Sequence, residues 1–267
     1  MSNSCIVTTG LRAGAAETAL AEYFGRLLHV PVVPRGGLSL AVLSEMYGVP
    51  GVLVVSARRV AYVSGGEEFF FHPSLAVLRI KEMLAGKTDQ MIKAMDLRPG
   101  DAILDCTLGL ATDAIVAAYA AGEEGRVVGL ESSPVLAAVV GYGLRHFQTE
   151  YVDGLTAAMR RVRVENRDHL SCLAGLPAGS FDVVYFDPMF RRPRYRSCAI
   201  HPLRLLAEPS PLEPRALELA RRVARRRVVV KERRGSSEFA RLGIARVEGG
   251  RYAPVVYGII ETGGGGA

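Results

Sequence analysis

Residues 181–190 read FDVVYFDPMF, a buried-strand pattern that opens directly into a short polar motif. Phe181–Phe186 is one of five strand candidates that follow one another along the chain, and helical patterns separate most of them. The other strands are expected at Ala102–Asp105, Arg126–Glu131, Val162–Asn166 and Arg226–Lys231, and the helices at Asp113–Ala121, Pro134–Phe147 and Glu213–Ala224. This alternation predicts a mostly parallel sheet covered by helices.

The flanking segments extend this plan. Helices expected at about Ser74–Leu84 and Asp89–Met95 lead into the first strand. At the other end, Ile244–Glu248, the turn Gly249-Gly250 and Tyr252–Ile260 have the pattern of an antiparallel β-hairpin. Residues 73–267 are therefore expected to form one α/β domain.

Residues 1–72 have a smaller α/β pattern of their own. Strands are expected at Cys5–Thr8 and Gly51–Ser56, an extended stretch at Val30–Val33, helices at Ala13–Leu28 and from the N-cap Ser39 to Tyr47, and a closing hairpin at Val60–Val63 and Phe69–Phe71. We take residues 1–72 as a small N-terminal α/β domain, to which the sequence assigns no role.

The composition excludes several classes of protein. With 267 residues, 49% of them apolar, the chain can bury a substantial core, which excludes a disordered protein. The four cysteines and five histidines show no CxxC or HExxH spacing, so we expect neither a metal site nor a disulfide framework. No signal pattern and no apolar window of about 18 residues is found, so we expect a cytoplasmic protein without a membrane span. The oligomeric state is left open.

The positive charge is concentrated in one segment. The formal net charge is +6, yet Phe190–Arg234 holds 14 Lys and Arg against four Glu, a local excess of +10. Ten of these basic residues form two groups: Arg191, Arg192, Arg194 and Arg196 after the polar motif, and Arg225–Arg227, Lys231, Arg233 and Arg234 around the last parallel strand. We expect them to follow a nucleic-acid backbone beside the active site. The alternatives are a solvated surface and, for Arg225–Arg227, the covering of a helix end.

The loop Asp105-Cys-Thr-Leu-Gly109-Leu-Ala-Thr-Asp113 follows the first strand of the large sheet, where open α/β sheets bind ligands. Dinucleotide-binding loops need several glycines so that the backbone can approach a pyrophosphate, and here only Gly109 is present. S-adenosylmethionine (SAM) has no phosphate, and acidic residues such as Asp105 and Asp113 suit its ammonium and sulfonium groups. A generic strand–turn–helix with an N-capping Asp113 is the alternative.

Two more strand ends offer polar groups. Glu131 ends the second strand, where an acidic residue can accept hydrogen bonds from ribose hydroxyls, although a solvated acid is also common there. After the third strand, Asn166-Arg-Asp168-His169 can run beneath an adenine, with Asp168 as the acceptor for its amine.

Asp187-Pro-Met-Phe190 has the most specific chemistry. It resembles the [D/N]-P-P-[Y/F] motif of methyltransferases that modify planar exocyclic amines, with Met189 in place of the second proline. The lone pair of such an amine is delocalised into the ring, so its nitrogen is a poor nucleophile. The Asp187 carboxylate and the Pro188 carbonyl can accept its two N–H bonds and favour a pyramidal nitrogen, and the base can stack on Phe190.

Together these segments resemble the ribosomal small-subunit methyltransferase J family, which methylates the N2 amine of a guanine in 16S rRNA. The resemblance covers about residues 95–235 and rests on Asp105-x-Thr-x-Gly-Leu-x-x-Asp-Ala114, Glu131 with Pro134 and Ala137, Asp182-Val-Val-Tyr-x-Asp-Pro-Met-Phe190 and Val228-Val-Val-Lys231. A Phe71-His-Pro-Ser74 motif before the domain is similar to a group of Gram-positive relatives. The resemblance implies the Rossmann-like fold of class I methyltransferases, and cofactor contacts at Thr112-Asp113, Glu131-Ser132, Asp168-His169 and Asp187.

The resulting expectation is a SAM-dependent N-methyltransferase whose partner is rRNA or the small ribosomal subunit and whose target is guanine N2. Asp187, Pro188 and Phe190 are the expected catalytic residues, and Phe190, Arg191, Arg192, Arg194, Lys231 and Arg233 the expected substrate contacts. Methylation of a DNA amine or of a protein amide stays open, as does a non-catalytic RNA-binding module. The single Gly109 disfavours a nicotinamide dehydrogenase.

Overall fold

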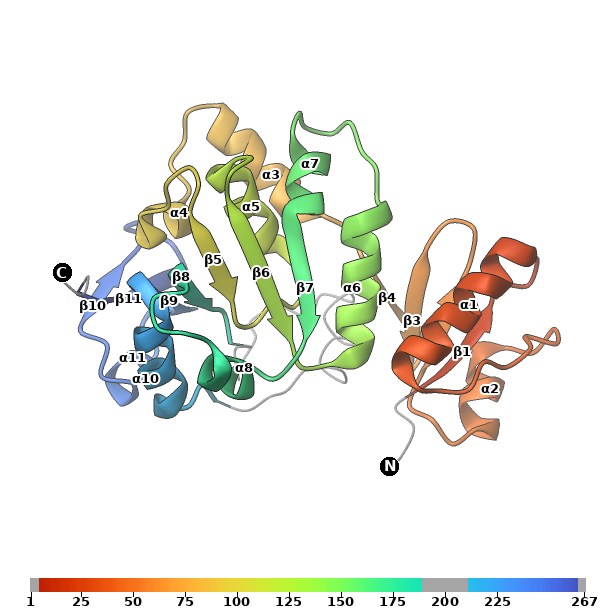
Figure 1. The fold of residues 1–267 in the computed structure, drawn as a ribbon. Helices are drawn as coiled ribbons and strands as arrows, with labels where there is room; N and C mark the ends of the chain where they lie inside the picture. The colour runs from red at the N-terminus through yellow and green to blue at the C-terminus, as the bar shows by residue number, and fades with distance from the viewer. Residues whose placement is uncertain (1–4, 189–210, 264–267) are drawn as a thin grey trace.

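The computed structural model describes residues 5–188 and 211–263, which form two β-sheets (Figure 1). The larger sheet has the strand order β10-β11-β9-β8-β5-β6-β7. Its strands are β5 (Ala102–Asp105), β6 (Arg126–Glu131), β7 (Val162–Asn166), β8 (Phe181–Phe186), β9 (Ala224–Arg233), β10 (Arg246–Glu248) and β11 (Val255–Glu261). β5 to β9 pair in parallel, and β11 lies antiparallel between β9 and β10. The predicted mostly parallel sheet with a C-terminal antiparallel hairpin is confirmed.

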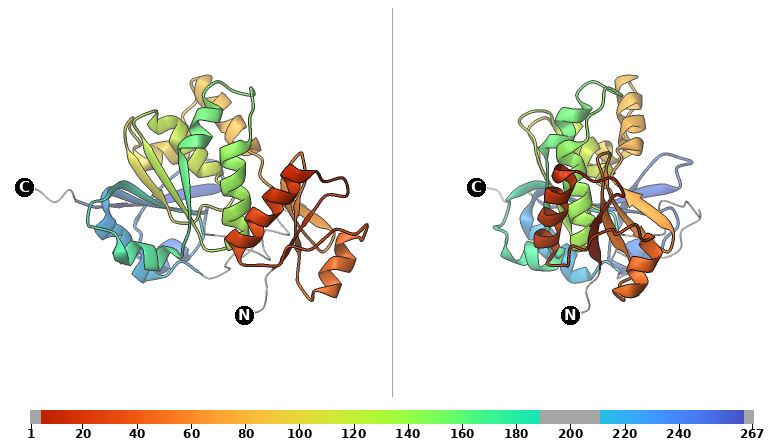
Figure 2. Two further views of the ribbon diagram at one scale, coloured as in Figure 1. Left: turned by 45° about the vertical axis from the view of Figure 1, so that its right-hand side comes forward. Right: turned by 90° about the vertical axis from the view of Figure 1, so that its right-hand side faces the viewer.

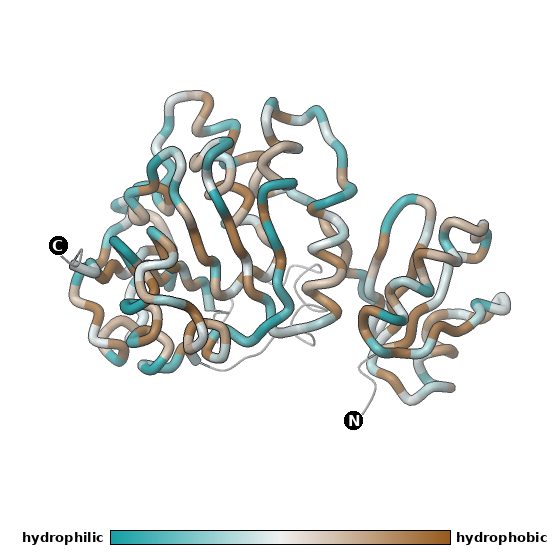
Figure 3. The backbone as a smooth tube through the Cα atoms, in the orientation of Figure 1, coloured by the Kyte–Doolittle hydropathy of each residue, from teal (hydrophilic) through white to brown (hydrophobic). Residues whose placement is uncertain are grey.

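Helices cover both faces of this sheet, because successive strand residues point to opposite sides. α3 (Ser74–Leu84), α4 (Gln90–Met95), α5 (Thr112–Ala121), α6 (Pro134–His146) and α7 (Leu155–Arg161) share a core with one set of strand residues, among them Ile103 and Val183. α8 (His169–Gly175), α10 (Pro214–Val223) and α11 (Glu238–Arg241) pack against the other set, among them Leu104 and Val184. Figure 3 shows the hydrophobic centres of these strands.

The smaller sheet has the order β1-β2-β3-β4, with β1 parallel to β2 and the other pairs antiparallel. Its strands are β1 (Ile6–Thr9), β2 (Val52–Val55), β3 (Val60–Ser64) and β4 (Glu67–Phe70). Two helices accompany it, α1 (Ala15–Leu28) and α2 (Leu40–Met46). The predicted hairpin of β3 and β4 is confirmed, and the small N-terminal sheet precedes the large one as expected.

Helix α6 joins the two sheets (Figures 1 and 2). The Tyr142 ring lies edge-on to the Phe24 ring of α1, with 5.6 Å between the ring centroids. At Gly143 the backbone of α6 lies so close to the Phe71 side chain that a Cβ would be 2.2 Å from Phe71 Cγ. Only glycine therefore fits at this position. Both units therefore contribute to one continuous core, and the division into domains after residue 72 stays a prediction.

Some element bounds differ from those expected. Val30–Val33 forms only an isolated bridge between Val32 and Val7, and β11 begins at Val255 instead of at Tyr252. The sequence patterns missed α7, α8 and α11, which are seven, seven and four residues long. A helix of one or two turns is too short to show a repeating apolar face. Within the described residues, no helix is long and apolar enough to cross a membrane.

Candidate active site

The polar strand ends predicted from the sequence meet at one edge of the larger sheet. Asp105, Glu131 and Asn166 are the last residues of β5, β6 and β7, whose arrowheads point to the same edge in Figure 1. Asp187 follows β8 at this edge. Parallel strands bring their carboxyl ends together, so residues distant in the sequence become neighbours here.

The loop after β5 is anchored by hydrogen bonds to neighbouring strands. Asp105 Oδ1 accepts a hydrogen bond from the Thr107 N–H at 3.0 Å, and the Thr107 hydroxyl oxygen accepts one from the Asp187 N–H at 2.6 Å. Gly109 and Ala111 both have a positive φ, +50° and +60°. A left-handed alanine costs about 1–2 kcal/mol, so surrounding contacts must hold this loop in shape.

Glu131 connects that loop to the start of α6. Its Oε2 accepts a hydrogen bond from the Gly109 N–H at 3.1 Å, and its Oε1 accepts one from the Ser133 N–H at 2.9 Å. The Asn166 side-chain amide donates to the carbonyl oxygens of Glu131 and Ser132 at 2.8 and 3.1 Å. Burial raises the pKa of Glu131, and these backbone donors oppose the rise. Glu131 and Ser132 thus lie in a rigid frame beside the β5 loop.

Asp168 and His169 lie at the start of α8. The Asp168 side chain caps this helix by accepting a hydrogen bond from the Ser171 N–H at 2.9 Å. The His169 ring lies edge-on to Phe186, with centroids 5.9 Å apart. Burial lowers the pKa of His169, so its ring is neutral at pH 7.

Asp113 is a buried residue in the first turn of α5, next to the carboxyl edge of the larger sheet. Its carboxylate accepts hydrogen bonds from the Tyr185 hydroxyl at 2.7 Å and from Lys231 Nζ at 2.9 Å, and it pairs with the Arg79 guanidinium. Burial alone would raise its pKa, but the Lys231 and Arg79 cations outweigh burial and hold the pKa below its usual range. Protein cations thus engage this carboxylate, and its contact with a cofactor, like that of Thr112, stays a prediction.

Asp187 has its carboxylate against Lys231. The distance from Lys231 Nζ to Asp187 Oδ2 is 2.6 Å. Burial raises the pKa of Asp187 to about 6, although the Lys231 ammonium opposes the rise. Pro188 is the last described residue of the motif, and Phe190, Arg191, Arg192 and Arg194 lie outside the described residues.

Comparisons with known proteins agree with this geometry. Residues 71–242 match the family model described as "Putative SAM-dependent methyltransferase". The uncharacterized protein YpiP of Bacillus subtilis is 38% identical over 96% of this chain and 99% of its own length. The chain belongs to the SAM-dependent methyltransferases. Its sheet order, with an antiparallel strand beside the last parallel one, is the Rossmann-like methyltransferase fold expected from the sequence.

Two further relatives of the methyltransferase are informative. Ribosomal RNA small subunit methyltransferase J of Halorhodospira halophila is 32% identical, over 81% of this chain and 79% of its own length. The crystal structure of a SAM-dependent methyltransferase from Neisseria gonorrhoeae superposes with a TM-score of 0.65, covering 98% of this chain and 97% of the other at 19% identity. At that identity the superposition shows a shared fold, and it includes the N-terminal unit.

The residues of the β5 edge suit SAM, the cofactor of this methyltransferase. The Asp105 side chain is buried, and burial raises its pKa to about 8, which the Thr107 N–H only partly offsets. The Lys231 ammonium also opposes this rise, and it is paired with Asp113 and Asp187. Without a ligand Asp105 is therefore mostly protonated at pH 7, and a ligand ammonium beside it would favour the ionised carboxylate. When bound, SAM supplies a methyl group on a sulfonium.

The basic residues of the methyltransferase do not all lie at this edge. Arg225, Arg226 and Arg227 are at the start of β9, roughly 13–20 Å along the strand from Lys231. Arg226 binds Asp101 through two hydrogen bonds of 2.8 and 2.6 Å, and Arg227 pairs with Glu261. The prediction that Arg225–Arg227 follow a nucleic acid beside the active site is therefore wrong.

The later basic residues are placed differently from one another. Arg234 donates hydrogen bonds to the carbonyl oxygens of Ala253 and Gly250, which holds the hairpin loop against the end of β9. Arg233 is the last residue of β9, and its N–H donates to Glu232 at 2.6 Å. The Lys231 ammonium lies between Asp113 and Asp187, inside the site instead of on its rim.

Four residues of this site were missed by the sequence patterns. Arg79 precedes all the predicted motifs, and Thr107 lies within the β5 loop motif with no role of its own. Asn166 is predicted at the end of a strand and in the motif that follows, but not as a hydrogen-bond partner of the Glu131 segment. Tyr185 had a usable signal, because it lies two residues before Asp187 and strand residues two apart share a face. For Arg79 there is no local signal, since its partner Asp113 lies 34 residues further along the chain.

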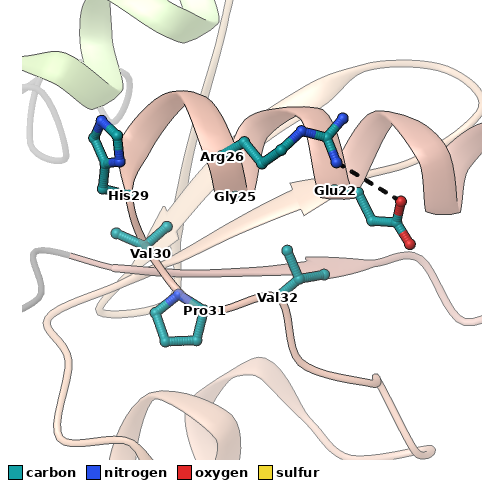
Figure 4. A pocket seen from close by; sticks show the side chains of 7 residues that line it. All are labelled: Glu22, Gly25, Arg26, His29, Val30, Pro31 and Val32. Atoms are coloured by element: carbon teal, nitrogen blue, oxygen red, sulfur yellow. Dashed lines mark ion pairs between the residues drawn. The ribbon is translucent and has the colours of Figure 1, made fainter.

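A hollow elsewhere on the surface has none of this chemistry. It lies between α1 and the segment that follows it, and is lined by Glu22, Gly25, Arg26, His29, Val30, Pro31 and Val32 (Figure 4). All of these residues belong to the N-terminal unit, and none comes from the strand ends of the larger sheet. The candidate active site is therefore the carboxyl edge of the larger sheet, where the polar strand ends meet.

Proposed function

We propose that this enzyme transfers the methyl group to an exocyclic amine of a nucleobase in RNA, and that guanine N2 in rRNA is its target. The observation that carries the proposal is the position of Asp187 at the end of β8. Its backbone N–H donates a hydrogen bond to the Thr107 hydroxyl of the loop after β5. This bond keeps the expected amine acceptor beside the loop that suits SAM. An rRNA target also implies that the enzyme acts in the cytoplasm.

The chemistry of such an amine matches Asp187 and Pro188. A carboxylate and a carbonyl oxygen that accept the two N–H bonds reduce the delocalisation of the nitrogen lone pair into the ring. That nitrogen would take the methyl group from the sulfonium, whose C–S bond electrons stay on sulfur as a neutral thioether, and the nitrogen loses a proton afterwards. With a pKa of about 6, the Asp187 carboxylate is ionised at neutral pH and is able to accept this proton.

The choice of RNA rests on two separate observations. The relative from Halorhodospira halophila is by its name a methyltransferase of small-subunit rRNA. The segment directly after the Asp187 motif also has an excess of positive charge in Arg191, Arg192, Arg194 and Arg196, which suits a phosphate backbone. A small uncharged substrate would need no such excess.

The proposal is tested by mass spectrometry of rRNA nucleosides from cells with and without the protein. We expect one methylated guanosine to disappear from small-subunit rRNA and to return when purified enzyme and SAM are added to the unmodified subunit. Loss of a methylated DNA base or of a methylated protein amide would replace RNA by that substrate. Unchanged methylation of all three would contradict the proposal.

A further inference from the structure

Five charged side chains form a row that ends at Asp187. In order they are Asp89, Arg79, Asp113, Lys231 and Asp187, with alternating sign. They come from the N-cap of α4, from α3, from α5, from β9 and from the residue after β8. The row therefore connects Asp187 to elements on one face of the sheet.

The row is buried along most of its length. The side chains of Asp89 and Asp113 are each 9% exposed and that of Lys231 is 19% exposed, whereas Asp187, at the end, is 28% exposed. Two hydrogen bonds join Arg79 to Asp89, at 2.8 and 2.9 Å. The inner members are therefore fixed, and the member open to a substrate is the terminal carboxylate.

We propose that Lys231 is a positioning residue for Asp187: its ammonium holds Oδ2 and keeps the carboxylate ionised, while Asp113 and Arg79 hold Lys231 in place. The inference rests on the proposed role of Asp187 as the amine acceptor. It replaces the phosphate contact that the sequence suggested for Lys231. The ion pair engages Oδ2, and in this proposal Oδ1 accepts the N–H of the amine.

The electrostatics explain why a cation is needed at this point. Asp187 is faced by Asp105 from β5, Asp113 from α5 and Tyr185 from β8. Among the described residues, Lys231 is the cation in direct contact with it. Without Lys231 a buried carboxylate beside Asp113 would take up a proton more readily. A protonated Asp187 carries no negative charge to attract an amine N–H or to accept a proton. Lys231 therefore sets the pH below which Asp187 stops working.

The direct test is a titration of the Asp187 carboxyl carbon by NMR, in enzyme without SAM, with Asp187→Asn to assign the signal. Lys231→Met should raise the pKa of Asp187 by about one unit or more, so that the ratio of its protonated to its ionised form rises about tenfold. Lys81→Met is the matched control, because Lys81 is exposed on α3, two residues from Arg79, and its loss should leave the titration unchanged. An unshifted Asp187 signal in Lys231→Met would overturn the proposal.

Two further variants separate positioning from a merely structural role. Asp113→Asn removes the neighbouring negative charge and should move the pKa of Asp187 downward, opposite to Lys231→Met. Lys231→Arg keeps the cation and should restore the original titration. If Lys231→Met does not fold, the charge-conserving pair Asp113→Asn/Lys231→Met still raises the pKa, since Lys231 acts on Asp187 more strongly than Asp113 does. If the pKa of Asp187 shifted in the same direction in all of these variants, the positioning role of Lys231 would be contradicted.

Methyl transfer then distinguishes this inference from the proposed function. The acidic limb of kcat/KM for RNA should follow the NMR pKa, moving to higher pH in Lys231→Met and staying in place in Lys231→Arg. If Asp187→Ala still transfers methyl groups, the proposed function fails. If Asp187→Ala is inactive while Lys231→Met keeps both the titration and the pH profile of the wild type, only the role of Lys231 fails.

Discussion

The two ends of the parallel strands carry similar residues but opposite balances of charge. At the amino end, Asp101 is matched by Arg226, and Asp182 both accepts a hydrogen bond from the Ala102 N–H and lies 3.3 Å from Arg225. At the carboxyl end, the described carboxyl groups of Asp105, Asp113 and Asp187 lie around Lys231. Asp113 also pairs with Arg79, and Glu131 ends the neighbouring strand without a cation among its described partners.

This difference separates a structural network from a binding site. Paired charges at the amino end satisfy one another and stabilise the fold. Buried carboxyl groups in excess destabilise it, and such groups are retained where a ligand or a reaction uses them. For this methyltransferase the excess lies where a cationic cofactor and an amine are expected, so the imbalance itself marks the site.

The largest expected effect comes from replacing, one at a time, the two aspartates near the ends of β8. Asp187→Ala should lower the methyl-transfer rate by about 10²–10³-fold, because a preorganised acceptor is lost, with the fold kept. Asp182→Ala should instead reduce the free energy of unfolding by about 1–3 kcal/mol and leave the rate unchanged. Single-turnover transfer to RNA and urea unfolding measure the two effects. Equal losses of rate in both variants would remove the distinction between the ends.

Cofactor binding should depend on the carboxyl end alone. SAM at about 100 times its Kd should stabilise the wild type by ~2.7 kcal/mol, and NAD should give no gain. Glu131→Ala should weaken SAM binding roughly tenfold or more through lost ribose contacts. Glu261→Ala, which removes an exposed acid paired with Arg227 at the amino end, is the control and should leave the affinity unchanged. Thermal unfolding with and without ligand reports all of these outcomes.

The two ends should also respond to pH with opposite sign. The pKa of Asp101 is lowered, because Arg226 outweighs burial, so its contribution to stability is present above about pH 4 and is lost as the pH falls through the folded-state pKa. The pKa of Asp105 is raised to about 8, so stability is lost as the pH rises from about 4 toward 8.

Two substitutions test this contrast by unfolding at several pH values. Asp105→Asn should stabilise the protein without SAM at neutral pH, by on the order of 1–3 kcal/mol, and weaken SAM binding. Arg226→Met should lower the free energy of unfolding at neutral pH. It should also make that free energy less dependent on pH in the acidic range. If Asp105→Asn destabilises at all pH values, the carboxyl end does not hold the excess charge inferred for it.

The smallest effect per residue is expected in RNA binding. Replacing Arg191, Arg192 and Arg194 together with Ala should reduce the slope of log K against log[salt] by about 2–3, if each meets one phosphate. Arg221→Ala/Arg225→Ala removes basic residues at the other end of the sheet and should leave the slope unchanged. SAM affinity should be the same in all variants. An unaltered slope in the triple variant would contradict a phosphate contact by these arginines.

Much of the fold was readable from local sequence patterns. Strand composition and turn residues repeat over a few positions, so Phe181–Phe186 and Arg126–Glu131 were placed with the bounds that the structure shows. The positions of Asp105, Glu131 and Asp187 followed, because a residue that ends a parallel strand must lie at the carboxyl edge. These three could be chosen as site candidates without any coordinates.

The tertiary structure alone decided what these side chains touch. Asp113 meets Arg79 and Lys231, which lie 34 and 118 residues away in the sequence, so no local pattern could pair them. Arg226 and Lys231 belong to one strand and have the same charge, yet one stabilises the amino end and the other lies beside Asp187. Sequence spacing sets how far apart residues of one strand lie, whereas the packing of helices against the sheet determines which distant charges become buried together.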